Sequence, residues 1–235
     1  MSVTNEYSAR WFASFMDTMP EAWTALEVSG VSRRLPLPAF RRVLDVCCGT
    51  GRHATRLCEL GYEVTGVDRD EAALGRSRSS APHATFVRLD QRDLQALAGT
   101  FDAALILWQS FGHFDPATND RILADIAAKL RPGGRLLLDL FHPAAISAGH
   151  AQPVRPPRAD GAIVTDRVGN GRLRSTIAYP DGATETMDFE LFTPEVLVER
   201  AKRAGFSVLE QCCWWDEARP PDPTERRYQS VFERG

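Results

Sequence analysis

The 235-residue chain has no excess of positive charge, no long apolar run and no signal-like start, and each absence excludes a class of protein. Its 28 Lys and Arg residues stand against 31 Asp and Glu residues, for a formal net charge of −3, which is not the charge balance of a general nucleic-acid binder. No window approaches the about 18 consecutive apolar residues of a membrane-spanning helix, and Met1 to Arg10 lack a secretory pattern. We therefore expect a cytoplasmic protein with neither nucleic acid nor a membrane as partner.

Metal-binding patterns are also missing. The five cysteines include no C-x-x-C spacing, and the five histidines include no pair at helical spacing for a metal. The adjacent pairs Cys47/Cys48 and Cys212/Cys213 are expected to act as small buried hydrophobic residues, as is Cys58. The sequence therefore predicts no metal site.

Short apolar runs alternate with amphipathic stretches through the middle of the chain. Hydrophobic residues make up 43% and charged residues 25%, the composition of an ordinary globular protein. Continuous apolar runs separated by helical patterns are typical of a parallel sheet that is buried on both faces. The strands are expected at residues 42–46, 63–67, 85–89, 102–107 and 135–140, with helices at 51–60, 71–78 and 118–130 between them.

The flanking regions carry other patterns. Tyr7, Trp11 and Phe15 form an aromatic row at i, i+4, i+8 that predicts an N-terminal helix, and a second short helix is expected at 21–28. The proline-rich stretch 143–157 indicates a loop. Runs at 162–168, 172–179 and 184–191, separated by Gly-containing turns, predict a small antiparallel sheet. A helix at 193–205 and strands at 206–214 and 228–232 would bring the main sheet to seven strands.

These patterns divide the chain into four parts. We expect an N-terminal helical lid (1–40), a ligand-binding core (41–142), a loop with an antiparallel insertion on the substrate side (143–192), and a C-terminal helix with the last two strands of the core sheet (193–235). The predicted fold class is α/β, with a mostly parallel seven-stranded sheet, helices on both of its faces, and a small antiparallel insertion after the fifth strand.

The first strand breaks at a glycine-rich turn. The segment Val43-Leu44-Asp45-Val46-Cys47-Cys48-Gly49-Thr50-Gly51 runs from an apolar strand into a helix, and glycine lets a ligand approach the backbone there. A purely structural turn would also favour glycine. Asp68 and Asp90 follow the next two strands at spacings of one strand-plus-helix unit, so all three acids are expected near the carboxyl edge of the sheet. Asp68 is suited to ribose hydroxyls, Asp90 to a purine amine, and Asp45 to a cation such as an ammonium group.

These motifs, together with Phe101-Asp102 and Leu130-Arg131-Pro132-Gly133-Gly134, resemble the class I S-adenosylmethionine-dependent methyltransferases, over about half of the chain. The first glycine of that family's loop is here Cys47. The resemblance implies a Rossmann-like sheet and S-adenosylmethionine as cofactor, with Gly49 and Gly51 at its methionine part, Asp68 at its ribose, and Asp90 with Gln91 at its adenine. The predicted cofactor-binding residues are Asp45, Cys47, Gly49, Gly51, Asp68, Arg69, Asp90, Gln91, Leu107 and Trp108.

The later part of the chain resembles methyltransferases that act on small molecules. The tetrapeptide Asn-Pro-Pro-Tyr of one type of nucleic-acid methyltransferase is replaced after the fourth strand by Trp108-Gln109-Ser110-Phe111. A small-molecule acceptor is therefore expected, with its methyl group received on oxygen or nitrogen. Candidate acceptor-side residues are Tyr7, Trp11, Gln109 and Ser110.

Methyl transfer from a sulfonium is an in-line displacement, which needs alignment and exclusion of water more than acid–base chemistry. His113 and His142, just past the fourth and fifth strands, are the candidate general bases. Each would equally serve as a loop residue bonded to backbone, and the aromatic row would equally pack on the sheet without forming a lid.

Two other functions compete with this interpretation. An NAD-type oxidoreductase would use machinery such as Tyr-x-x-x-Lys, but neither Lys129 nor Lys202 has a tyrosine four residues before it. A non-catalytic S-adenosylmethionine-binding or regulatory protein stays open, as does association into a homodimer.

Overall fold

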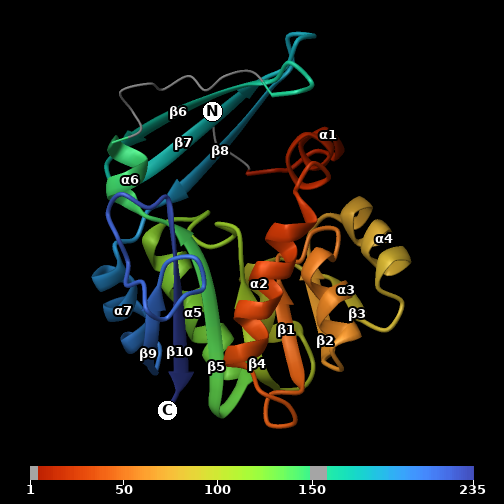
Figure 1. The fold of residues 1–235 in the computed structure, drawn as a ribbon, viewed down its shortest axis with the longest axis vertical. Helices are drawn as coiled ribbons and strands as arrows, with labels where there is room; N and C mark the ends of the chain where they lie inside the picture. The colour runs from red at the N-terminus through yellow and green to blue at the C-terminus, as the bar shows by residue number, and fades with distance from the viewer. Residues whose placement is uncertain (1–4, 149–157) are drawn as a thin grey trace.

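A twisted seven-stranded sheet forms the body of the computed structural model, which describes residues 5–148 and 158–235 (Figure 1). The strand order is β3-β2-β1-β4-β5-β10-β9, and only β10 runs antiparallel to its neighbours. The strands are β1 (Arg42–Val46), β2 (Glu63–Asp68), β3 (Thr85–Arg88), β4 (Phe101–Ile106), β5 (Leu130–Phe141), β9 (Phe206–Cys212) and β10 (Arg227–Arg234). The predicted α/β class with a seven-stranded, mostly parallel sheet is confirmed.

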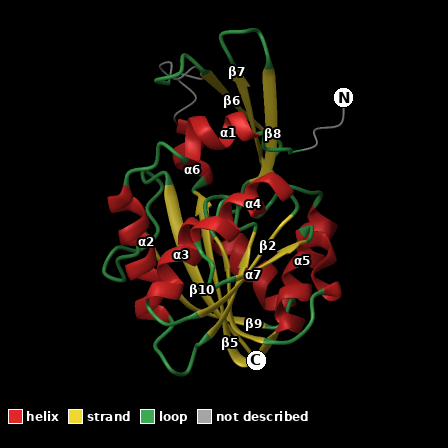
Figure 2. Ribbon diagram, turned by 90° about the vertical axis from the view of Figure 1, so that its right-hand side faces the viewer, coloured by secondary structure: helices red, strands yellow, loops and turns green. Residues whose placement is uncertain are grey.

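Helices cover both faces of this sheet (Figure 2). Alternate side chains of a strand point to opposite faces, so Val43 of β1 enters the core beneath α2 and α3 while Leu44 enters the core beneath α5 and α7. Both residues are fully buried, as the continuous apolar strand predicts. The helices are α2 (Glu21–Arg34), α3 (Arg52–Glu59), α4 (Glu71–Ser80), α5 (Pro116–Lys129) and α7 (Pro194–Arg203).

A second sheet, which we call sheet B, is inserted between α6 and α7 and lies above the upper edge of the main sheet in Figure 1. Its strands pair in the order β6-β7-β8, all antiparallel, which confirms the predicted antiparallel insertion after the fifth strand. Their bounds are β6 (Ile163–Gly169), β7 (Arg172–Ala178) and β8 (Thr184–Glu190).

The N-terminal segment closes over the same edge. It contains α1 (Ala9–Trp11), a π-helical turn at Phe12–Met16, and then α2. The short helix expected at 21–28 instead continues to Arg34. Trp215 packs against this helix at Gly30, where an added Cβ would lie 2.5 Å from Trp215 Cγ. We call residues 5–20 the lid segment.

One further expectation needs correction. The stretch 143–157 was expected to be a loop, but its first six residues form the helix α6 (Pro143–Ala148). Proline at a first helical position costs no hydrogen bond, and the Ile146 N–H donates to the His142 carbonyl. The remainder of that stretch, residues 149–157, lies outside the described residues.

Candidate active site

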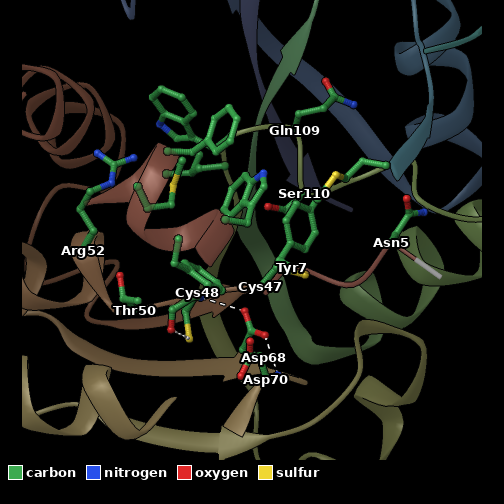
Figure 3. Close-up of a pocket in the computed structure, with 18 of the residues that line it drawn as sticks. Asn5, Tyr7, Cys47, Cys48, Thr50, Arg52, Asp68, Asp70, Gln109 and Ser110 are labelled. Atoms are coloured by element: carbon green, nitrogen blue, oxygen red, sulfur yellow. Dashed lines mark hydrogen bonds between the residues drawn. The ribbon is translucent and has the colours of Figure 1, made fainter. Parts of the chain in front are cut away.

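A cavity of about 540 Å³ lies where the carboxyl ends of the parallel strands meet the lid segment and sheet B (Figure 3). The turns after β1 to β4 form its floor, and side chains of the lid segment and of sheet B form the opposite walls. Most of the residues predicted from the sequence line it: Tyr7, Trp11, Asp45, Cys47, Gly49, Asp68, Arg69, Asp90, Gln91, Leu107, Trp108, Gln109, Ser110 and His113. Gly51 and His142 do not.

The turn after β1 has a left-handed backbone. Cys47, Gly49 and Gly51 have φ values of 60°, 54° and 78°, a region that glycine adopts without steric cost. The Gly49 N–H donates to Asp68 Oδ2 at 2.9 Å, and the Asp70 N–H donates to Asp68 Oδ1 at 2.9 Å. Figure 3 shows these bonds joining the β1 and β2 ends at the cavity floor. Asp68 therefore ties the glycine turn to the next strand.

The two glycines of this turn have different roles. Gly49 lines the cavity, whereas a Cβ at Gly51 would lie 2.8 Å from Ser77 Cβ on α4. A side chain at Gly51 would therefore collide with α4, and the assignment of both glycines to the ligand stays a prediction.

We expect Gly51→Ala to lower the free energy of unfolding by about 2 kcal/mol, from left-handed strain and overpacking. Gly49→Ala carries the left-handed strain, about 1 kcal/mol, and a milder contact, 3.2 Å from the added Cβ to Phe12 Cε1; it should lose ligand binding in a folded protein. Urea unfolding and calorimetry with S-adenosylhomocysteine separate the two losses. Equal losses of stability with unchanged ligand binding in both variants would contradict this division.

Asp45 is a buried acid without a partner. Its side chain lines the cavity at 2% exposure, and Oδ2 has no hydrogen bond within the described residues. Burial raises the pKa of Asp45 to about 7; the Asp68 charge adds to this rise, and the Arg52 charge opposes it. A buried acceptor of this kind requires a donor from a ligand or water, and a cationic group satisfies it best.

At the end of β3, the two residues expected at adenine, Asp90 and Gln91, differ in how their oxygen atoms are used. Asp90 already accepts from Arg92 Nε at 2.9 Å and Nη2 at 2.8 Å. These bonds lower the pKa of Asp90 although burial opposes the shift. Gln91 donates through Nε2 to the Ser110 carbonyl, but its buried Oε1 has no partner among the described residues. Gln91 thus supplies an unused acceptor at this end of the cavity.

Sequence analysis missed Glu27, which ties helix α2 to the cavity wall. Glu27 is only 4% exposed. Its carboxylate accepts hydrogen bonds from Arg52 and from Trp108 Nε1, both at 2.5 Å, and lies 2.9 Å from His53 Nε2. Although burial alone would raise it, the hydrogen bond from His53 and the charge of Arg52 lower the pKa of Glu27 to about 2. The signal was its position on the apolar stripe of α2, beside Val28 and Val31.

Tyr7 and His113 meet at the wall between the lid segment and β4. The Tyr7 hydroxyl lies 3.1 Å from His113 Nε2. Burial, with the charges of Arg69 and Arg172, lowers the pKa of His113 to about 3, and burial raises that of Tyr7. Both side chains are therefore uncharged near neutral pH. We therefore expect His113 not to ionise in the usual range of a histidine, near pH 6.5.

His142 lies apart from this wall. Its Nδ1 accepts from the Ala144 N–H at 3.3 Å, and its ring meets Tyr228 edge-on at 5.8 Å. His142 is not among the residues that line the cavity, although Phe141 before it is; its role as a base stays a prediction.

Gln109 is fully used in holding two strand ends together. Its Nε2 donates to the Phe111 carbonyl at 3.0 Å, and its Oε1 accepts from the Phe141 N–H at 2.6 Å. Ser110 is different, because its hydroxyl makes no hydrogen bond within the part of the chain that the structure describes. Arg69 donates to the Asn5 carbonyl and so anchors the lid segment.

The comparisons with known proteins agree with this geometry. Residues 43–134 match the model of a family described as a methyltransferase domain. The putative methyltransferase YqeM of Bacillus subtilis is 37% identical over 109 residues, 44% of each chain. The chain spans about half the length of the curated relatives it matches.

Solved structures match over nearly the whole chain. An S-adenosylmethionine-dependent methyltransferase from Clostridium acetobutylicum has a TM-score of 0.78 at 15% identity, covering 97% of both chains. CalS10, an amino pentose methyltransferase from Micromonospora echinaspora, has a TM-score of 0.71 at 21% identity, covering 100% of both. The chain shares the fold of these methyltransferases, and residues 43–134 are similar to a methyltransferase domain.

Two structural absences accompany this result. No helix among residues 5–148 and 158–235 is long and apolar enough to cross a membrane. Within the same ranges, no group of three or more His, Cys, Asp or Glu side chains could hold a metal ion.

Proposed function

We propose that this protein transfers a methyl group from S-adenosylmethionine to an oxygen or nitrogen atom of a small-molecule acceptor. The observation that carries the proposal is the presence, in one cavity, of the unpartnered Asp45 carboxylate oxygen and of Asp68 at the adjacent strand end. These groups suit the two ends of a methionine-nucleoside ligand, an ammonium group and a ribose.

The donor half of the cavity fits S-adenosylmethionine group by group. Asp45 would hold the ammonium group. Each Asp68 oxygen uses one lone pair on a backbone N–H and keeps one for a ribose hydroxyl. The unused Gln91 Oε1 and the neighbouring Asp90 would meet the exocyclic amine of adenine. When bound, the ligand supplies an electrophilic methyl group on a positively charged sulfur.

The chain's own contribution to the reaction is alignment and exclusion of water. The lid segment is bonded to sheet B through Ser8, which donates to Glu185, and through Arg10, which lies 2.5 Å from Asp181. The two walls therefore close over the cavity as one surface. Because His113 and Tyr7 are uncharged near neutral pH, turnover is not expected to follow a histidine ionisation.

Affinity for S-adenosylhomocysteine, which retains the ammonium group, is expected to depend on pH through Asp45. Its carboxyl, with a pKa of about 7, carries its charge above that pH and loses it below. Binding should therefore weaken by up to about tenfold for each pH unit below 7. Calorimetry from about pH 5.5 to 8 measures this slope. The Asp45→Asn variant should bind more weakly, with no slope; an unchanged slope in that variant would remove Asp45 from the assignment.

The proposal as a whole is tested by binding and by product. The purified protein should bind S-adenosylhomocysteine, and with S-adenosylmethionine and a pool of small metabolites it should release S-adenosylhomocysteine. Absence of any binding would end the proposal. Binding without release from any acceptor would favour the non-catalytic alternative.

A further inference from the structure

The acceptor side of the cavity is built from apolar side chains on two elements. The lid segment contributes Trp11 and Phe15, whose rings stack at 5.3 Å with an interplanar angle of 12°. Sheet B contributes Val164, Ile177, Met187 and Phe189. We call these six residues the acceptor chamber. A ligand in it contacts aromatic and aliphatic groups on both sides.

Several polar groups near the acceptor chamber already have partners among the described residues. Ser175 donates to Asp166 Oδ1 at 2.5 Å, and Asn5 uses its amide on the His113 and Asp188 backbones. The guanidinium of Arg158 bonds the Ser14 carbonyl and lies 4.1 Å from the Phe15 ring centroid. A ligand rich in hydroxyl groups would find few partners here, and each buried unsatisfied hydroxyl costs about 1 to 3 kcal/mol.

One wall of the cavity carries a polar pair, the Tyr7 hydroxyl and His113 Nε2 at 3.1 Å. Ser110, whose hydroxyl has no hydrogen bond to the described residues, lines the same cavity. The ring of Phe189 lies 5.1 Å from the His113 ring, so this polar spot is framed by an aromatic face. The arrangement accepts one polar group at the leading end of a flat, apolar molecule.

We propose that the acceptor is an aromatic compound with an amino or hydroxyl group on its ring, otherwise apolar; this rests on the proposed function. The ring lies among the acceptor-chamber residues, and its polar group faces Ser110 and the Tyr7–His113 pair. The lone pair of the acceptor nitrogen or oxygen forms the new bond to the methyl carbon. The carbon–sulfur bond breaks, its electron pair stays on sulfur, and the acceptor's proton leaves to solvent.

The likeness to an amino pentose methyltransferase suggests a different acceptor, and this makes the inference testable. An amino sugar presents several hydroxyl groups, whereas an alkylated aniline or phenol presents one polar atom. The chamber residues named above therefore favour the second class.

The experiment compares 4-propylaniline, 4-propylphenol and glucosamine as acceptors. Release of S-adenosylhomocysteine gives kcat/KM, and calorimetry on the protein loaded with S-adenosylhomocysteine gives acceptor affinity. At least one aromatic probe should show a kcat/KM 100-fold or more above glucosamine and should bind the loaded protein. With the phenol, kcat should rise with pH as its hydroxyl ionises, whereas with the aniline it should be flat.

Matched variants locate the effect. Val164→Thr places a hydroxyl in the chamber at nearly constant volume, and should raise the KM of the aromatic probe about fivefold with kcat unchanged. Ile163→Thr also introduces a threonine hydroxyl, one residue earlier at an exposed position, and should leave both constants unaltered.

The outcomes separate this inference from the proposed function. Turnover of glucosamine but not of the aromatic probes would overturn the aromatic class and leave methyl transfer standing. Failure of both aromatic probes to bind the loaded protein would also overturn it. Failure to bind S-adenosylhomocysteine would instead remove the proposed function itself.

Discussion

Replacing Asp68 with alanine is expected to weaken binding of S-adenosylhomocysteine by about 150-fold or more. The carboxylate would accept both ribose hydroxyls, and each hydrogen bond to a charged group contributes about 1.5 to 3 kcal/mol, so losing two costs about 3 kcal/mol at least. Calorimetry measures the loss directly. Asp68 also accepts hydrogen bonds from the Gly49 and Asp70 N–H groups, so circular dichroism should be measured beside calorimetry to verify that the variant is folded.

Two further variants make this result specific. Asp68→Asn keeps the shape and one acceptor oxygen, and should bind with intermediate affinity. Asp93→Asn changes an exposed carboxylate outside the cavity lining and should bind as the parent does. If Asp68→Ala bound as tightly as Asp93→Asn, the ribose assignment would be wrong.

The second large effect concerns stability. Glu27→Gln should lower the free energy of unfolding by about 3 to 5 kcal/mol, because it removes one partner of a buried ion pair and leaves the Arg52 charge uncompensated. Glu27 is 5% and Arg52 17% exposed in their side chains. Urea unfolding at neutral pH measures the loss.

The same helix provides the control. The side chain of Glu21 is 67% exposed and pairs with Arg56. Glu21→Gln should therefore lower the free energy of unfolding by about 0.5 kcal/mol or less. The folded pKa of Glu27 lies below its unfolded value, so its contribution is present above about pH 4.5 and is lost as pH falls toward 2. Equal stability of the two variants would mean that Glu27 does not hold α2 in place.

The acceptor half of the cavity was only partly predictable. The sequence shows the aromatic row of Tyr7, Trp11 and Phe15 but not the residues that the row contacts. Tyr7, for example, bonds His113, which lies 106 residues away in the sequence. The low pKa of His113 depends on burial and on two arginines from distant segments, and neither cause leaves a local pattern. Glu27 was overlooked because a carboxylate on an apolar stripe has meaning only when its three donors are known.

The sequence by itself determined the α/β class, the approximate strand positions and the gathering of three acidic residues at one cavity. Apolar runs and turn glycines are local signals, and parallel strands bring their carboxyl ends to one edge, so spacing alone placed Asp45, Asp68 and Asp90 together. Tertiary structure decided the rest: that Gly51 packs against α4, that Gln91 keeps an unused acceptor, and that His142 does not line the cavity. The physical reason is that burial, charge and hydrogen bonding at those positions come from segments far apart in the chain, and only folding brings them within contact.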